Sequence, residues 1–197
     1  AGSRGATRED LKFVHGLVEK AKGQDNSARQ TLSQMMKVDN ILSVSGYEAS
    51  LQEVGELAGK NFYGMTGALK KYNLEQVIQF IDAGINLHSL TTAKEVTYKL
   101  GHNLGPQEVA EIAAHNIDGL ENAFKIFNLD EIRTLLRQDV NLPVAEAVLN
   151  NTKQFGYELG IDQIASVAKN VYDVNDFISA LRGLPLAEVE KIFSDGI

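Results

Sequence analysis

The 197-residue chain has no cysteine, no tryptophan and only three prolines. Without cysteine it can form no disulfide framework, no thiolate zinc site and no cysteine nucleophile. The scarcity of proline fits a chain rich in helices, because proline interrupts a helix interior. No apolar run approaches the roughly 20 residues that a membrane-spanning helix needs, so we expect no membrane partner.

Positive charge is also in short supply. Lysine and arginine number 19 against 26 acidic residues, which gives a formal net charge of −7. This balance disfavours nucleic acid as a partner, although a local basic strip could still bind it. The longest basic clusters, Lys70-Lys71 and Arg133/Arg137, are short and are expected to be solvated helix faces. The composition is typical of a soluble folded protein and leaves the compartment open, in the cytoplasm or delivered into a host cell.

The main feature of the chain is an internal sequence repeat. Residues 50–87 match residues 105–142 without a gap at a shift of 55 residues. The matched pairs include Val54/Val109, Leu57/Ile112, Asn61/Asn116, Gly64/Gly119 and Asn73/Asn128. A fixed period of this length is typical of repeat architectures, in which each unit is one supersecondary element.

Each copy divides into two helical hairpins, one short and one long. Apolar residues at i, i+3 and i+4 give the first helix of each hairpin one buried stripe. The stripes begin at Val54, Val77, Val109, Ile132, Ile164 and Val189. Because one hairpin cannot bury its stripe alone, stacked hairpins must share a core. We therefore predict an all-α superhelical stack of hairpins, an α-solenoid repeat array with a 55-residue double-hairpin period.

The long second helices are expected over residues 90–103 and 144–158. Each ends near one of three glycines that lie 55 residues apart, Gly46, Gly101 and Gly156. A glycine in this place is most often the left-handed cap of the helix. A second glycine group, at Gly55, Gly59, Gly64 and Gly67, is expected to allow close helix packing, and we find no convincing strand.

The repeat also predicts the domain boundaries. Residues 1–6 read as a flexible leader or tag remnant, and 7–197 as a single helical-repeat domain. That domain comprises a diverged unit at 7–49 with its turn at 23–27, repeats at 50–104 and 105–159, and a partial repeat at 160–197. Because the sequence stops one helix into a unit, we expect it to be a fragment of a longer protein.

No constellation of residues points to catalysis, a metal or a cofactor. The four histidines lack helical metal-site spacing, and the pairs Glu53/Glu56 and Glu108/Glu111 recur with the repeat. Recurrence favours a solvated face over a unique acid–base pair. No phosphate-binding glycine loop occurs, so we predict a non-enzyme with no small-molecule ligand.

Two kinds of position remain as binding candidates. Exposed tyrosines are good interface anchors, although the same rings could half-cover the core. The turn triplets 61–63, 84–86, 116–118, 139–141 and 170–172 each combine a capping residue with a varying neighbour. They could serve turn chemistry alone or form a row that reads a ligand. The candidate residues are Phe62, Tyr63, Ile85, Tyr98, Ile117, Asp118, Val140 and Tyr172.

The segment Pro106–Ala113 with Asn116-Ile117, Gly119 and Ala123-Phe124 resembles the repeat of transcription-activator-like effectors and related bacterial helical-repeat proteins. In that family a short helix leads into a turn whose two variable residues face a DNA base. The resemblance implies a helical repeat array and DNA binding through the inter-helix turns. It covers about 20 residues of each copy.

The leading functional prediction is a non-catalytic repeat scaffold that binds another protein, with a bacterial effector or adaptor as a fitting setting. The alternative is a DNA-binding array of the transcription-activator-like type.

Overall fold

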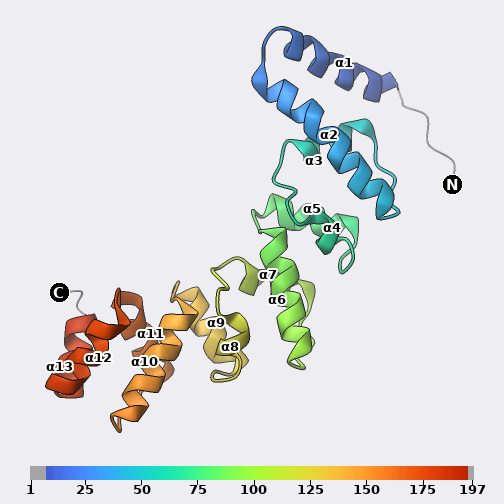
Figure 1. Cartoon of the computed structure of the whole chain (residues 1–197). Helices are drawn as coiled ribbons and strands as arrows, with labels where there is room; N and C mark the ends of the chain where they lie inside the picture. The colour runs from blue at the N-terminus through green and yellow to red at the C-terminus, as the bar shows by residue number, and fades with distance from the viewer. Residues whose placement is uncertain (1–7, 195–197) are drawn as a thin grey trace. The chain divides into compact units, whose positions relative to one another are not determined.

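The computed structural model describes residues 8–194, and all regular secondary structure in that range is helical (Figure 1). The all-α prediction is therefore confirmed, while the predicted leader at 1–6 lies outside the described residues. The helices are α1 (Arg8–Lys22), α2 (Asn26–Val44), α3 (Leu51–Ala58), α4 (Met65–Ala68), α5 (Leu74–Asp82), α6 (Leu87–Lys99), α7 (Pro106–Ala113), α8 (Leu120–Ala123), α9 (Leu129–Arg137), α10 (Leu142–Gln154), α11 (Ile161–Asn170), α12 (Val174–Gly183) and α13 (Leu186–Ser194). None of these helices is long and apolar enough to cross a membrane.

The chain divides into two compact units, one running to Thr92 and the other beginning at Ala93. The division falls inside α6, whereas the repeat predicted a single domain with a repeat boundary after residue 104. A hairpin array can divide in this way because each hairpin of such an array packs mainly against its neighbours.

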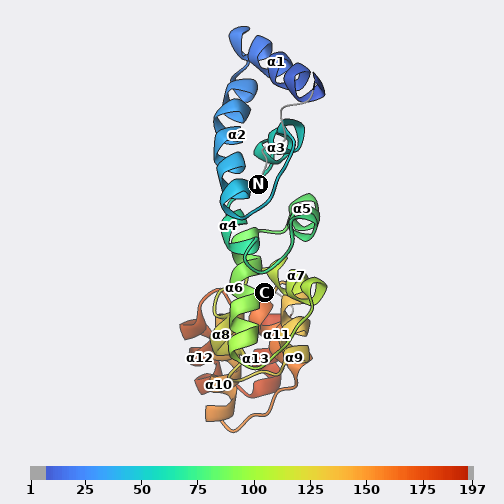
Figure 2. The ribbon, with the colours of Figure 1, turned by 90° about the vertical axis from the view of Figure 1, so that its right-hand side faces the viewer.

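In the first unit, the long helix α2 packs against both α1 and α3 (Figure 2). The turn between α1 and α2 is tighter than the expected 23–27, because Asp25 caps α2 and accepts a hydrogen bond from Ala28 N at 3.1 Å. Gln24 supplies the left-handed residue of that turn, with φ +68°. Helices α1 and α2 thus form one long hairpin.

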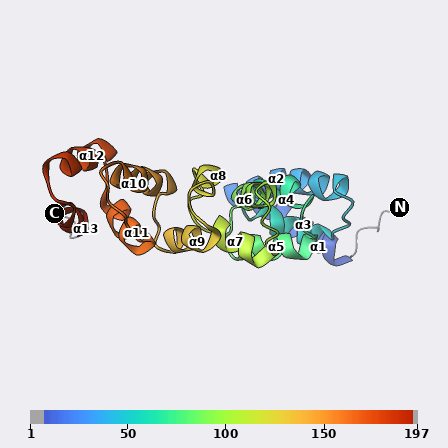
Figure 3. The same cartoon turned by 90° about the horizontal axis from the view of Figure 1, so that it is seen from below.

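In the second unit, the helices form two rows (Figure 3). The first helices of successive hairpins, α9, α11 and α13, pack in one row, and the second helices, α8, α10 and α12, pack in the other. Inter-helix turns of successive hairpins therefore follow one another along one edge.

The predicted apolar stripes form the core. All six stripe-starting residues are at most 3% exposed. They are Val54, Val77, Val109, Ile132, Ile164 and Val189. On α3 and α7 the stripe continues through residues at i+3 and i+4, which are also buried. The 3.6-residue period thus identified the buried face of every first helix from α3 onward.

Local capping fixes where the helices begin. Ser50, Asn73 and Asn128 each form a reciprocal capping box with the residue three positions on. The long helices α6 and α10 begin three and two residues earlier than predicted. The reason is that Asn86 and Asn141 cap them, accepting from Ser89 N at 3.0 Å and Val144 N at 3.2 Å.

The three glycines 55 residues apart end the long second helices, as predicted. Gly46, Gly101 and Gly156 have φ values of +79°, +84° and +82°. In each case the next residue donates its main-chain N–H to a carbonyl five residues back, at 2.8–2.9 Å, as in a Schellman cap. The second helices of the short hairpins differ in length. Both α4 and α8 span four residues, whereas α12 spans ten.

Candidate functional site

The turns of the short hairpins are built around an asparagine. Asn61 and Asn116 accept hydrogen bonds from the main-chain N–H two residues on, at Tyr63 and Asp118, with distances of 3.1 and 3.0 Å. The middle residues, Phe62 and Ile117, are half-buried. The third residue of each triplet, Tyr63 or Asp118, is exposed and differs between the copies, whereas the exposed first residue is asparagine in both.

A left-handed glycine then presses each short turn against the following long hairpin. Gly64 has φ +87°, and a Cβ there would lie 2.7 Å from His88 N at the start of α6. Gly119 has φ +78°, and a Cβ there would lie 2.8 Å from the ring of Pro143 in α10. The close approach fixes neighbouring turns side by side.

The turns of the long hairpins are of a different kind. Their first residue, Gly84 or Asp139, is left-handed, with φ +74° or +54°. Ile85 and Val140 then donate their N–H groups to carbonyls five residues back, at 2.9 and 3.0 Å. The five triplets therefore do not share one geometry, although the alignment predicted equivalent places.

Ile85 and Val140 carry out a structural task in these turns. Ile85 is half-buried, and Val140 is only 3% exposed. An apolar residue at this place in a helix cap packs back onto the end of the helix. The structure therefore corrects the prediction that the Val140 side chain faces a partner: it contributes only to the floor of a recess.

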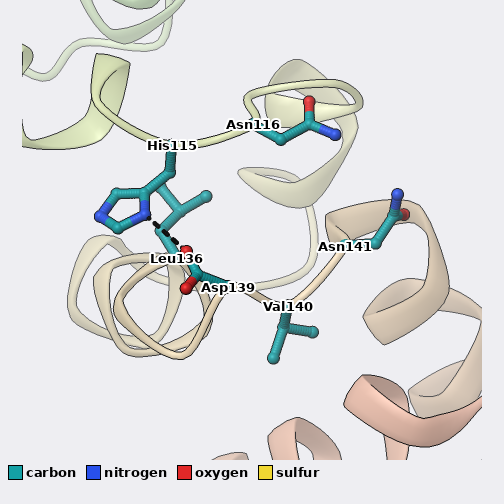
Figure 4. A pocket seen from close by; sticks show the side chains of 6 residues that line it. All are labelled: His115, Asn116, Leu136, Asp139, Val140 and Asn141. Carbon is teal, nitrogen blue, oxygen red and sulfur yellow. Dashed lines mark hydrogen bonds and ion pairs between the residues drawn. The ribbon is translucent and has the colours of Figure 1, made fainter. Parts of the chain in front are cut away.

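That recess, which we call the turn pocket, lies between the turns of two successive hairpins in the second unit. It has a volume of about 280 Å³ and is lined by His115, Asn116, Leu136, Asp139, Val140 and Asn141 (Figure 4). His115 Nδ1 lies 3.1 Å from Asp139 Oδ1. A carboxylate only accepts, so this ring nitrogen carries the proton.

Sequence reasoning missed the turn pocket. The histidines lack the spacing of a helical metal site, and Asp139 is predicted only as part of the turn triplet 139–141. The missed signal is that both members of the pair differ between copies, with Lys60 in place of His115 and Gly84 in place of Asp139.

An ionic network joins α7 to α9 beside this pocket. Arg133 Nη2 lies 2.7 Å from Glu108 Oε1, and Arg137 Nη2 lies 2.6 Å from Glu111 Oε1. The Gly105 main-chain N–H, together with the Arg133 guanidinium, holds the pKa of the Glu108 carboxyl below its usual range. These carboxylates and arginines are thus not the merely solvated faces that we expected, because stacking of the hairpins brings them together.

The candidate tyrosines separate into exposed and covered groups. Tyr172 is 100% exposed, Tyr98 is 71% exposed and Tyr63 is 68% exposed. The Tyr63 ring centroid lies 5.9 Å from that of His88. Tyr72, by contrast, is buried against Phe80. Three tyrosines therefore remain available for binding, two of them in turns and one on α6.

The third short-hairpin turn departs from the other two. Asn170 belongs to α11, Val171 is buried, and Asp173 caps α12. Tyr172 is therefore the residue of this turn that faces outward. With Tyr63 and Asp118, it shows that the turns present one exposed, variable side chain each.

The chemistry of this edge suits binding. Within residues 8–194, no group of three or more histidine, aspartate or glutamate side chains could hold a metal ion. The turn pocket offers hydrogen-bonding groups over an apolar floor, and the adjacent turns offer aromatic rings.

Comparison of the chain with protein-family models, with curated proteins and with solved structures yields no match. The likeness to transcription-activator-like effector repeats stays a prediction from the sequence.

Proposed function

We propose that the chain is a non-catalytic helical-repeat scaffold that binds another protein through its inter-helix turns. The observation that supports this most directly is the exposure of tyrosine at two of these turns, with Tyr172 at 100% and Tyr63 at 68%. Tyrosine offers a large, stiff and half-polar surface, which is why it is enriched at the centres of protein interfaces. A ring left fully in water adds no burial energy to the fold, so it is free to contribute to binding. A bacterial effector or adaptor is a setting that fits such a scaffold.

DNA binding through the turns is the weaker alternative. Neighbouring turns lie side by side, as a base-reading row requires. Yet Asp118 and Asp139 stand at these turns as exposed carboxylates, and the chain carries a net charge of −7. Both features repel phosphates, which supply most of the affinity of proteins for DNA.

Site-specific photo-crosslinking tests the proposal. Tyr172 of the full chain is replaced by p-benzoylphenylalanine, and the protein is irradiated in a lysate of its native cell. We expect a protein adduct that unlabelled wild-type chain abolishes and that a Tyr63→Ala/Tyr172→Ala chain does not. Both rings are mostly exposed, so this variant is expected to fold.

The matched control places the crosslinker at Lys153, an exposed residue at the opposite end of α10 from the turn. An adduct of equal yield at Lys153, or no competed adduct at Tyr172, would contradict binding at the turns. A gel shift of duplex DNA that weakens steeply with salt would favour the alternative instead.

A further inference from the structure

The turn pocket carries a specific chemical signature beyond the exposed tyrosines. We propose that it binds a basic side chain of the protein partner, with arginine as the best fit and the Asp139 carboxylate as the counter-ion. This inference rests on the proposed function and names the chemistry that the partner brings to one site.

Asp139 is an unusual residue for its position. Its backbone is left-handed, with φ +54°, where the first copy has Gly84. A left-handed backbone costs free energy for any residue that has a Cβ. In return, the turn places a carboxylate at the rim of the pocket, with the side chain 84% exposed. Oδ1 faces His115, but a carboxylate has about four acceptor sites on its two oxygens, so both oxygens can accept from a further donor.

The two asparagines of the pocket supply the opposite chemistry. Asn116 Oδ1 accepts from Asp118 N, and Asn141 Oδ1 accepts from Val144 N, at 3.0 and 3.2 Å. With the oxygens committed, the amide nitrogens are left as donors, and both face the gap between the turns (Figure 4). A main-chain carbonyl of a partner fits these donors.

Acceptor and donors together match an arginine residue in a peptide. The guanidinium can present two parallel N–H groups to a carboxylate, which a lysine cannot do. Leu136 and Val140, which are 2% and 3% exposed, form an apolar floor for the aliphatic stem. An anionic ligand is disfavoured because it would meet Asp139.

The charge of the surroundings favours a cation as well. Residues 1–92 contain ten basic and ten acidic residues, whereas residues 93–197 contain nine basic and sixteen acidic residues. The whole net charge of −7 therefore belongs to the unit that holds the pocket. Arg137, the basic residue nearest to Asp139 in sequence, is ion-paired with Glu111. A surface field of this sign raises the local concentration of cationic groups.

The first copy provides an internal contrast. There Lys60 stands in place of His115 and is ion-paired with Asp82, while Gly84 stands in place of Asp139. That turn presents a cation and lacks the rim carboxylate. We expect it not to bind arginine.

The test is an NMR titration of the isotopically labelled full chain with N-acetyl-arginine N-methylamide. We expect saturable shifts of the Asn116 and Asn141 side-chain amides, with a dissociation constant on the order of 1 mM for so small a ligand. Asp139→Asn should weaken binding about tenfold, since it removes the charge while asparagine tolerates the left-handed backbone. Asp130→Asn, which removes an exposed carboxylate at the opposite end of α9 from Asp139, should leave binding within about twofold.

The matched probe is the citrulline analogue, which has the same shape and no charge. Equal binding of citrulline, no saturable shift with the arginine compound, or undiminished binding to Asp139→Asn would overturn the inference. Duplex DNA that moves these amides where the arginine compound does not would overturn it too. If the crosslink at Tyr172 forms and is abolished by wild-type chain but the arginine compound does not bind, this inference is wrong and the proposed function stands. If the crosslink does not form, the proposed function is contradicted.

Discussion

The two central copies of the repeat, 50–104 and 105–159, share their caps and their left-handed glycines but join neighbouring first helices differently. In the second copy, Arg133 and Arg137 of α9 bond to carboxylates of α7. In the first copy, Ile78 and Asp82 occupy those positions on α5, and Asp82 pairs with Lys60 at the end of α3. The comparison teaches that the apolar stripe and the caps set the helix positions, so the ion pairs between neighbouring first helices can differ in their residues and their number.

The copies also differ at their turns and in their cores. The rim carboxylate of Asp139 replaces Gly84, and Phe127 replaces Tyr72. Exchanging residues between the copies therefore distinguishes side chains that stabilise the fold in both copies from those that are specific to one copy.

The largest expected loss of stability follows substitution of Gly64, whose equivalent in the second copy is also a glycine, Gly119. Gly64→Ala should lower the free energy of unfolding by about 2–4 kcal/mol, because a left-handed alanine is strained and overpacking adds to it. The new Cβ would lie 2.7 Å from His88 N, a main-chain atom that can move only with α6. Urea denaturation followed by circular dichroism measures the loss.

Gly46→Ala is the control for this substitution. Its φ of +79° is similar, but no atom lies within 4 Å of the added Cβ. We expect a cost of about 1 kcal/mol from the backbone alone. Equal losses in the two variants would show that contact with α6 does not matter.

The second-largest expected change in the free energy of unfolding comes from exchanging Tyr72 and Phe127, which occupy the same position in the two copies. The Tyr72 hydroxyl is buried and has no hydrogen-bond partner within the described part of the chain. Phe127→Tyr should therefore cost about 1–3 kcal/mol, as expected when a buried polar group is left unsatisfied. Tyr72→Phe should be neutral or stabilising, and a clear loss in thermal or urea stability would reveal a partner for the hydroxyl.

The burial of Tyr72 also predicts that the stability of the fold depends on pH in the alkaline range. Burial raises the pKa of its phenol from 10.0 to about 12. Because the folded pKa lies above the unfolded one, the related stability is fully present below pH 10 and is lost as pH rises toward 12. The difference in urea midpoint between wild type and Tyr72→Phe should widen in favour of the variant above pH 10. A constant difference would contradict the burial.

A smaller effect is expected at the turn pocket. Asp139→Gly should stabilise the chain by about 0.5–1 kcal/mol, because glycine adopts φ +54° without a Cβ penalty. Gly84→Asp in the first copy should cost a similar amount. If Asp139→Gly is instead destabilising by urea denaturation, the contact with His115 outweighs the backbone strain.

The smallest expected effect is a change in the pKa of Glu108, in the ionic network between α7 and α9. Arg133→Ile introduces the first copy's residue and should raise the pKa of Glu108, measured by carbon-detected NMR of its carboxyl. The value should stay below the usual range, because the larger cause, the Gly105 main-chain hydrogen bond, persists. The stability gained from this depressed pKa is present above the unfolded pKa and is lost as pH falls through the folded one. An unchanged pKa would mean that Arg133 does not affect the carboxyl.

Much of the fold could be predicted because its signals are local. The stripe from Val54 through Leu57 and Ala58 identifies a buried face within one helix. Asn73 and Gln76 form a capping box three residues apart, and Gly101 ends a helix through its own backbone. The missed starts of α6 and α10 had local signals as well, in Asn86 and Asn141.

The candidate site was predictable only in part. The turns were identified as variable, and Tyr63 and Tyr172 are exposed there. The buried state of Val140 depends on a cap geometry that differs between short and long hairpins, and one alignment of all five triplets hid that difference. His115 and Asp139 are 24 residues apart in the sequence, so a search for local motifs does not find the pair.

By itself, the sequence determined the helices, their period, their buried stripes and most of their ends, because these depend on contacts within a few residues along the chain. The tertiary structure decided which turn residues face solvent, which charges meet across α7 and α9, and that two turns enclose a pocket. Those features arise from stacking one hairpin on the next, which brings together residues more than 20 positions apart. The stripe requires stacking of some kind, but the geometry of the stack specifies the surface that a partner can bind.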